Sequence, residues 1–204
     1  MARYTGPKCR ICRRLNLSVC GSLRCALQRR ESPPGMHPRG ARKMSDFAKQ
    51  LAEKQKVKYT YWVGERQFKN YALAAFRQKG DSGANLLRLL ERRLDSVVYR
   101  LGFAPTLPAA RQLVAHGHIL VNGQRVDRPS YSVRKGEVVS LTEKSRKMKI
   151  VEEGLVRAMT RPRVPYIELD RERLAGTLVE LPRREEISIP VDDRLVVEYF
   201  SRKI

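Results

Sequence analysis

The sequence predicts an α+β protein in which a cysteine-rich, metal-held arm and a helical region accompany short helices packed on a small, mainly antiparallel sheet. Three observations support this fold class. All four cysteines lie within the first 25 residues, and apolar residues then recur at three- and four-residue steps as far as residue 114. Beyond that point, apolar and polar residues alternate around an Asn-Gly pair. The first spacing is typical of amphipathic helices and the second of hairpin strands.

The four cysteines form a candidate metal site. Cys9, Cys12, Cys20 and Cys25 follow the pattern C-x2-C-x7-C-x4-C. Two thiolates from one turn and a second pair complete a tetrahedron, so we expect one structural zinc ion (Zn), with an iron–sulfur cluster as the alternative. Free cysteines or two disulfides are the other interpretations, but disulfides are rare in a reducing cytoplasm. The basic residues around the cysteines should lower the pKa values of the thiols.

Residues 32–43, SPPGMHPRGARK, are predicted to be extended, because their prolines and glycines exclude a helix and a central strand. Arginine-rich segments commonly order on RNA. We therefore predict a segment that threads along RNA rather than a passive linker. The arm and this segment form the first predicted domain, residues 1–43.

Two helices are predicted over residues 46–59 and 65–79. In the first, which Ser45 can cap, Phe47 and Val57 should face inward with Leu51, and the lysines outward. The inward stripe of the second consists of Phe68, Tyr71, Ala72, Ala75 and Phe76. We interpret the aromatic residues of this region as core rather than as platforms for base stacking.

A longer helix is predicted from Ser82 to Leu101, where Gly102 ends it. Its apolar stripe consists of Leu87, Leu90, Leu94, Val97 and Leu101.

A second, shorter helix follows, capped by Thr106 and ended by Gly117. Its Ala and Leu positions should face inward, whereas Arg111 and Gln112 should point outward. Loss of the Arg111 side chain is therefore expected to spare folding.

After these helices the pattern becomes that of strands. Residues 118–121 and 124–126 flank Asn122-Gly123, the pair favoured in a type I′ hairpin turn. Further strands are predicted at residues 131–133, 137–141, 166–169 and 177–181, with helices at 145–160 and 191–201.

The composition implies an anionic partner. The chain of 204 residues holds 42 Lys and Arg against 21 Asp and Glu, a net charge of +21. Basic residues outnumber acidic ones by 11 to 1 in residues 1–43 and by 24 to 11 in residues 44–163, but the ratio is 7 to 9 in residues 164–204. We therefore expect RNA at the arm and the middle of the chain, with the last forty or so residues as scaffold.

Membrane and enzyme functions find little support. No apolar run is long enough to cross a bilayer, and the first residues lack the apolar core of a signal peptide, so a cytoplasmic protein is expected. No nucleophile lies beside a recognisable base, and no Gly-rich phosphate loop is present, so we expect neither catalysis nor a small-molecule substrate. An RNA-modifying enzyme and a zinc-dependent DNA-binding regulator are the alternatives, and the absence of a C2H2 pattern weighs against the second.

Residues 91–134 resemble the small RNA-binding module first named for the fourth protein of the small ribosomal subunit. The chain is similar to the bacterial family of that protein along its whole length. The similar segments are MARYTGPKCRICRR at the start, PPGMHPRGAR at 33–42, GERQFKNYA at 64–72 and LVVEYFSR at 195–202.

This resemblance implies that the C-terminal helix, 190–204, completes a helical domain formed by residues 44–93, and that residues 94–189 are an inserted RNA-binding module. It implies a structural constituent of the small ribosomal subunit that binds a multi-helix junction of 16S rRNA and nucleates assembly of the subunit body. It further implies a position near the path by which mRNA enters, a role in translational accuracy, and contact with the fifth small-subunit protein.

The side chains expected to contact RNA fall into three groups. Those of the arm and the extended segment are Arg3, Lys8, Arg10, Arg13, Arg14, Arg29, Arg30, His37, Arg39, Arg42 and Lys43. Those of the helical region are Arg66 and Lys69. Those of the module are Arg92, Arg100, Arg111, Gln112, His116, His118 and Asn122. Because A-form RNA hides its base edges, such side chains should read backbone geometry and unstacked nucleotides.

Overall fold

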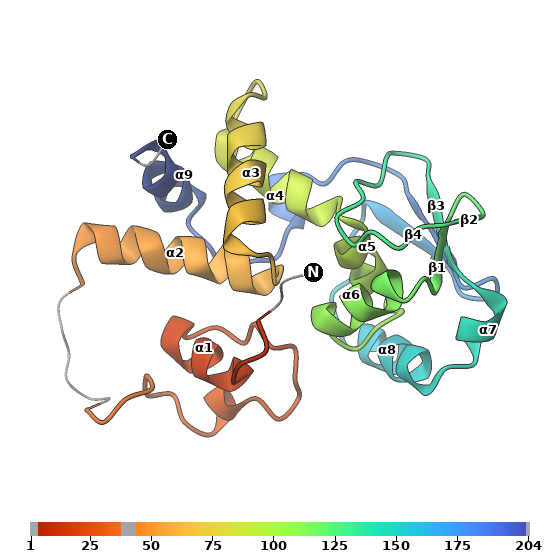
Figure 1. Cartoon of the computed structure of the whole chain (residues 1–204), viewed down its shortest axis with the longest axis horizontal. Coiled ribbons are helices and arrows are strands. Elements are labelled where there is room, and N and C mark those ends of the chain that lie inside the picture. The colour runs from red at the N-terminus through yellow and green to blue at the C-terminus, as the bar shows by residue number, and fades with distance from the viewer. Residues whose placement is uncertain (1–3, 38–43, 203–204) are drawn as a thin grey trace. The chain divides into compact units, whose positions relative to one another are not determined.

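The structure is a computed structural model that describes residues 4–37 and 44–202. The chain folds as two compact units, which we call the helical unit (residues 1–86 and 189–204) and the sheet unit (residues 87–188) (Figure 1). The predicted α+β class is confirmed. The predicted division into three domains, with the arm as a domain of its own, stays a prediction. Within the described residues, no helix is both long enough and apolar enough to cross a membrane.

The helical unit brings together segments from both ends of the chain. Its elements are α1 (Lys8–Leu15), a 3₁₀ helix (Ala26–Gln28), α2 (Asp46–Thr60), α3 (Glu65–Phe76), the first half of α4 (Ser82–Glu91) and α9 (Asp193–Ser201). The Ser45 hydroxyl begins α2 as predicted, accepting a hydrogen bond from the Ala48 N–H at 3.3 Å. Gln50 of α2 donates to Glu198 of α9 at 2.7 Å, across 148 positions of sequence.

Two predictions about the faces of α2 are wrong. Phe47 is 47% exposed in the first turn of α2, with its ring centroid 5.8 Å from that of Tyr199 on α9. Lys54, expected outside, is only 1% exposed. Its ammonium group pairs with Glu65 and lies 5.2 Å from the centre of the Tyr199 ring, so α9 covers this side of the helix.

The sheet unit contains the second half of α4 and a five-stranded sheet with short helices. Its further elements are α5 (Leu94–Arg100), α6 (Leu107–Ala115), β1 (Ile119–Val121), β2 (Gln124–Arg125), β3 (Val138–Leu141), α7 (Glu143–Arg146), α8 (Lys149–Met159), β4 (Ile167–Asp170), β5 (Ala175–Leu178) and a 3₁₀ helix (Arg184–Glu186). The strand order is β2-β1-β3-β5-β4, and every pair is antiparallel. In Figure 1, α5, α6 and α8 lie beside one another against the sheet, and their apolar residues share one core with it.

The predicted hairpin is present. Val121 pairs with Gln124, and the two turn residues both have positive φ, 49° at Asn122 and 80° at Gly123, as a type I′ turn requires.

The predicted long helix is interrupted. Helix α4 ends at Glu91, and Arg93 is extended, with φ −65° and ψ 140°, before α5 begins. The backbone here pairs with a neighbouring segment instead of continuing the helix: the Val133 N–H donates to the Arg92 carbonyl at 2.8 Å. The predicted strand 131–133 therefore forms only one isolated bridge, between Arg93 and Ser132. The five residues of the apolar stripe are nevertheless all buried.

The helix predicted over residues 145–160 is also two helices, α7 and α8. Met148 adopts extended angles between them, with φ −77° and ψ 131°. Within α7 the buried Ser145 hydroxyl lies 2.8 Å from the ring of His118 and 2.6 Å from the Thr142 hydroxyl, which ties this short helix to the residue before β1. The last predicted helix is present as α9, capped by Asp192.

Candidate metal centre and nucleic-acid interface

The arm brings its thiols together. Cys9 lies on α1, Cys25 directly precedes the 3₁₀ helix, and Cys20 lies in the loop between them. The sulfur atoms of these three cysteines lie within 4.8 Å of one another. Cys12, one turn further along α1, is outside that mutual group, although its thiol hydrogen-bonds with those of Cys20 and Cys25. Three predicted ligands are thus assembled into a group that could hold a metal ion, with the fourth in contact.

Burial, not the neighbouring positive charge, dominates the thiol pKa values. It raises the pKa of Cys12 to about 12 and also raises the pKa of Cys20. For Cys25, burial acts upward, but hydrogen bonds with the Leu27 backbone, Ser18 and the other thiols outweigh it and lower the pKa. The predicted lowering is therefore wrong for Cys12 and Cys20. Burial in a thiol cluster without a carboxylate nevertheless suits a soft, thiophilic cation, which would replace the thiol protons.

The packing of the arm fixes α1 and the loop after it. Val19 is buried, and its carbonyl accepts a hydrogen bond from the Trp62 indole N–H at 3.0 Å. The Arg13 guanidinium bridges to the far end of the arm, where its Nε donates to the Ser32 carbonyl at 2.9 Å. Arg13 is therefore partly committed to the arm itself.

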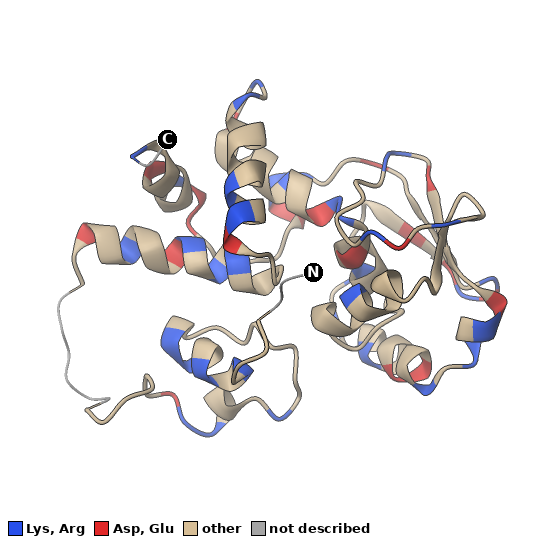
Figure 2. Ribbon diagram, viewed as in Figure 1, with Lys and Arg blue, Asp and Glu red and all other residues tan. Residues whose placement is uncertain are grey.

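Figure 2 marks the other basic residues of the arm in blue, and all of those within residues 4–37 are exposed. The exposed ones are Lys8, Arg10, Arg14, Arg24, Arg29 and Arg30. Within residues 4–37, no Lys or Arg forms an ion pair with a described acidic group. His37 is also exposed, and so are Arg66 and Lys69 on α3. The predicted contacts Arg3, Arg39, Arg42 and Lys43 lie outside the described residues.

Arg111 of the sheet unit is not on the surface as predicted. It is 8% exposed, and its Nε donates to Asp95 at 3.1 Å. Asp95 also receives two hydrogen bonds from the buried Arg93, at 2.9 and 2.7 Å. Close packing of α6 on α5 turns Arg111 toward this carboxylate, so one buried anion holds two guanidinium groups.

Arg100 is held in a similar way. Its guanidinium donates twice to the buried Glu91 carboxylate, at 3.1 and 2.5 Å, and Glu91 also accepts from the Tyr166 hydroxyl at 3.0 Å. Burial, reinforced by the negative charge of Glu91, raises the pKa of Tyr166, so this phenol stays a hydrogen-bond donor. The structure thus places Arg100 in an internal network with limited exposure.

Of the remaining predicted side chains of the module, some hydrogen-bond to the protein backbone and others are accessible. Arg92 donates from Nε to the Val133 carbonyl at 3.1 Å, and the Asn122 side chain accepts from the Val138 N–H at 2.9 Å. Gln112 and His116 are exposed, and His118 is half-buried. Burial, followed by the positive charges of His116 and Arg125, lowers the pKa of His118.

Sequence reasoning missed Arg125. It lies on β2, is exposed, and donates from Nη2 to the His116 carbonyl at 3.2 Å, so it stands beside both histidines. Exposed basic residues of α7 and the turn after it were missed as well: Lys144, Arg146 and Lys147. The alternation of side chains in the hairpin could have identified Arg125. It pairs with Leu120, which lies between the two buried residues of β1 and so faces the other side of the strand.

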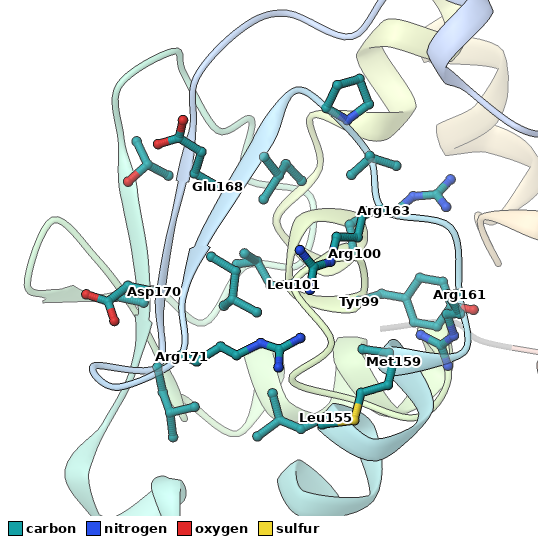
Figure 3. Close-up of a pocket in the computed structure, with 18 of the residues that line it drawn as sticks. Tyr99, Arg100, Leu101, Leu155, Met159, Arg161, Arg163, Glu168, Asp170 and Arg171 are labelled. Atoms are coloured by element: carbon teal, nitrogen blue, oxygen red, sulfur yellow. The ribbon is translucent and has the colours of Figure 1, made fainter.

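A groove with a volume of about 1260 Å³ opens between α8 and strands β4 and β5 (Figure 3). Leu101, Leu155 and Met159 give it an apolar floor. In Figure 3, the guanidinium groups of Arg100 and Arg171 lie near its middle. An apolar floor with arginines around it suits a protein segment better than a small ligand.

Two family models match the chain in succession. "Ribosomal protein S4/S9 N-terminal domain" matches residues 3–91, and "S4 domain" matches residues 92–139, so their boundary falls at the break between α4 and α5. The chain is 47% identical to small ribosomal subunit protein uS4 of Thermodesulfovibrio yellowstonii and to that of Thermus thermophilus, and 48% identical to that of Pelobacter propionicus. Each alignment covers 99% of this chain and 100% of the relative. The resemblance noted in the sequence is confirmed, and the chain belongs to the uS4 family of small ribosomal subunit proteins, which are structural proteins and not enzymes.

Proposed function

We propose that this protein is a primary rRNA-binding protein that binds a multi-helix junction of 16S rRNA and nucleates assembly of the body of the small subunit. The observation that carries the proposal is the accessible positive charge of the arm. Its exposed Lys and Arg residues have no anionic partner within residues 4–37 or in the rest of the described chain. Such cations release counterions when they meet phosphates, which is the main source of affinity for RNA.

The RNA contacts we assign follow from exposure. On the helical unit they are Lys8, Arg10, Arg14, Arg29, Arg30, His37, Arg66 and Lys69. On the sheet unit they are the exposed Gln112, His116 and Arg125, with the half-buried His118 beside them. Arg93, Arg100 and Arg111 support this surface from inside, because their guanidinium groups hold buried carboxylates.

Binding to two nucleic acids tests the proposal. The full-length protein is titrated with purified 16S rRNA and, in parallel, with duplex DNA of equal charge between 50 and 200 mM salt. We expect tighter binding to the rRNA at every salt concentration and a steep loss of affinity as salt rises, about 10³-fold for six or more phosphate contacts. Equal affinity for both would favour a nonspecific or DNA-binding protein, and chemical turnover of the rRNA would favour a modifying enzyme. Omission from an in vitro assembly of the small subunit should stop later proteins from joining.

We assign zinc to the thiol cluster. Thiolates bind zinc tightly, and a site in which sulfur atoms fill the coordination shell is structural rather than catalytic. Elemental analysis of the purified protein should give one zinc per chain and no visible absorbance. Several irons per chain with a brown colour would replace zinc by an iron–sulfur cluster.

A protein neighbour fits the groove of the sheet unit, and we propose that it is the fifth small-subunit protein. Met159 is 66% exposed at the groove, whereas Val156, 64% exposed on the same helix, is not part of its lining. Met159→Asp should reduce incorporation of the fifth protein into reconstituted particles, and Val156→Asp should not. Equal effects of the two variants would show that the groove does not bind the fifth protein.

We also propose that the assembled protein lies near the path by which mRNA enters and that it influences translational accuracy. An exposed, cationic arm supports this because mRNA is a polyanion. Crosslinking of mRNA downstream of the decoding site to the arm is the expected result. Misreading in cells that carry the Arg14→Gln protein should differ from that in cells with the unchanged protein.

A further inference from the structure

We propose that the groove between α1 and α2 binds one unstacked nucleotide of the RNA and recognises its base. This inference rests on the proposed function as an rRNA-binding protein. The groove has a volume of about 410 Å³. That is large enough for a base with its sugar and phosphate, but far too small for a helical segment of RNA. Its ligand is therefore a single residue taken out of a stack.

The walls of the groove come from one face of each helix. On α1 they are Arg10, Ile11, Arg14 and Leu15, on or just before α2 they are Met44, Ala48, Leu51, Ala52, Gln55 and Tyr59, and Tyr4 also lines the groove. The steps of three and four residues show that each set is a continuous helical stripe. The apolar members give the floor that the flat face of a base requires.

The charge of the groove selects an anion. Arg10 and Arg14 lie one turn apart on α1, both are exposed, and no acidic residue is among the lining. Guanidinium groups bind phosphate oxygens in pairs and also stack on bases. A neutral apolar ligand would leave both of them without a role.

An unsatisfied amide selects a base rather than a bare phosphate. The side-chain oxygen of Gln55 is buried in the groove wall and has no hydrogen-bond partner among the described residues. A buried amide of this kind is normally paired. The Watson–Crick edge of a base offers both donors and acceptors, so it satisfies the Gln55 amide in either orientation.

Aromatic rings complete the site. Tyr4 and Tyr59 stand edge to face, with ring centroids 6.0 Å apart. Tyr4 is 40% exposed, so part of its ring is open to a stacking partner. Stacking on exposed aromatic rings is a general way of holding unpaired nucleotides. The sequence led us to interpret Tyr59, like Trp62, as a core residue, and Trp62, which is buried, follows that interpretation.

Chemical probing of 16S rRNA bases, with and without the full-length protein, tests the site. The unchanged protein should protect at least one unpaired base that becomes reactive again with Gln55→Leu, a change that keeps the size of the side chain and removes its amide. Affinity should fall about three- to tenfold, the effect of one hydrogen bond, while the salt dependence stays the same. Arg14→Gln should instead reduce the slope of log affinity against log salt by about 0.7–0.9, because it removes a phosphate contact.

Two variants of Tyr4 test whether its ring stacks on the bound base. Tyr4→Leu should expose the same base and Tyr4→Phe should not, because the phenyl ring still stacks. Gln78→Leu, at an exposed glutamine after α3, is the matched control and should change nothing. If the rRNA still binds but no base protection depends on Gln55 or Tyr4, the groove is not a nucleotide site and the proposed function stands. If rRNA binds no better than duplex DNA, the proposed function fails first.

Discussion

The arm and the sheet unit use the same residue, arginine, for opposite purposes. In residues 4–37 the guanidinium groups are mostly exposed and form no ion pair with a described acidic group. In the sheet unit Arg93, Arg100 and Arg111 close around the buried carboxylates of Asp95 and Glu91. The arm packs through its buried thiols and apolar residues and makes no internal ion pairs among the described residues, so its cations are available to a ligand.

This difference shows that a high density of basic residues does not by itself mark a binding surface. A guanidinium beside a buried carboxylate already has its hydrogen-bond acceptors, and pulling it out would leave the acid uncompensated. An exposed one without an anionic neighbour gains its acceptors only from a partner. Five experiments test this distinction, beginning with the largest expected effect.

Removal of the metal should have the largest effect, and only on the arm. A structural zinc ion contributes on the order of 10 kcal/mol to the folding of small zinc domains. Cys9→Ser should therefore lose the ion and make the arm sensitive to trypsin, whereas α2, α3 and α9 keep their helical signal. Cys12→Ser should also weaken metal binding if the ion recruits the fourth thiol. Metal-free protein with a protease-resistant arm and full RNA affinity would contradict a structural site.

The same site predicts a dependence on pH. Burial raises the pKa values of Cys12 and Cys20, so metal binding must displace protons from these thiols. Metal affinity should fall as pH falls, and a competition titration with a chelator measures it.

Asp95→Ala should destabilise the sheet unit. Removing one partner from a buried ion pair typically costs about 3–5 kcal/mol, and here two guanidinium groups lose their counter-charge. Urea denaturation gives the free energy of unfolding. Glu180→Ala is the matched control, since Glu180 is exposed and pairs with Arg183 at 3.8 Å, a pair worth about 1 kcal/mol or less. Similar losses of unfolding free energy for both variants would show that the buried ion pair stabilises the protein no more than an exposed one.

Arg111→Ala and Arg125→Gln should have complementary effects. The first should lower the free energy of unfolding by about 1–3 kcal/mol, because a charge-assisted hydrogen bond is lost, and leave the salt dependence of RNA binding unchanged. The second should spare stability and reduce the salt slope by about 0.7–0.9, as one phosphate contact is lost. The reverse outcome would return Arg111 to the RNA interface.

His118 should give the smallest effect. Burial, with the charges of His116 and Arg125, lowers its pKa below the ordinary value of 6.5, so the folded state favours the neutral ring. Its contribution to stability is complete above pH 6.5 and is lost as pH falls through the lowered, folded-state pKa, because the unfolded chain takes up the proton first. Stability curves of the protein and of His118→Gln should converge in acid. Parallel curves would mean that His118 titrates normally.

Local patterns predicted the helices and the hairpin well, because capping residues, apolar spacing and Asn-Gly turns act over a few residues. They missed the break at Arg93, since backbone pairing with Ser132 is a contact between distant segments. The thiol cluster was predictable from spacing alone. The burial of Arg111 was not, because Asp95 lies on another helix and its charge is invisible to a pattern within α6.

The return of α9 to α2 has a consequence for biosynthesis. The sheet unit is one continuous stretch, residues 87–188, whereas the helical unit needs residues from both ends of the chain. Domains fold as they leave the ribosome, so the sheet unit can form before the last helix is made. Until then Gln50 and Lys54 lack Glu198 and Tyr199 beside them. The second unit in the chain is therefore expected to mature first, and the first unit is completed only after α9 has been made.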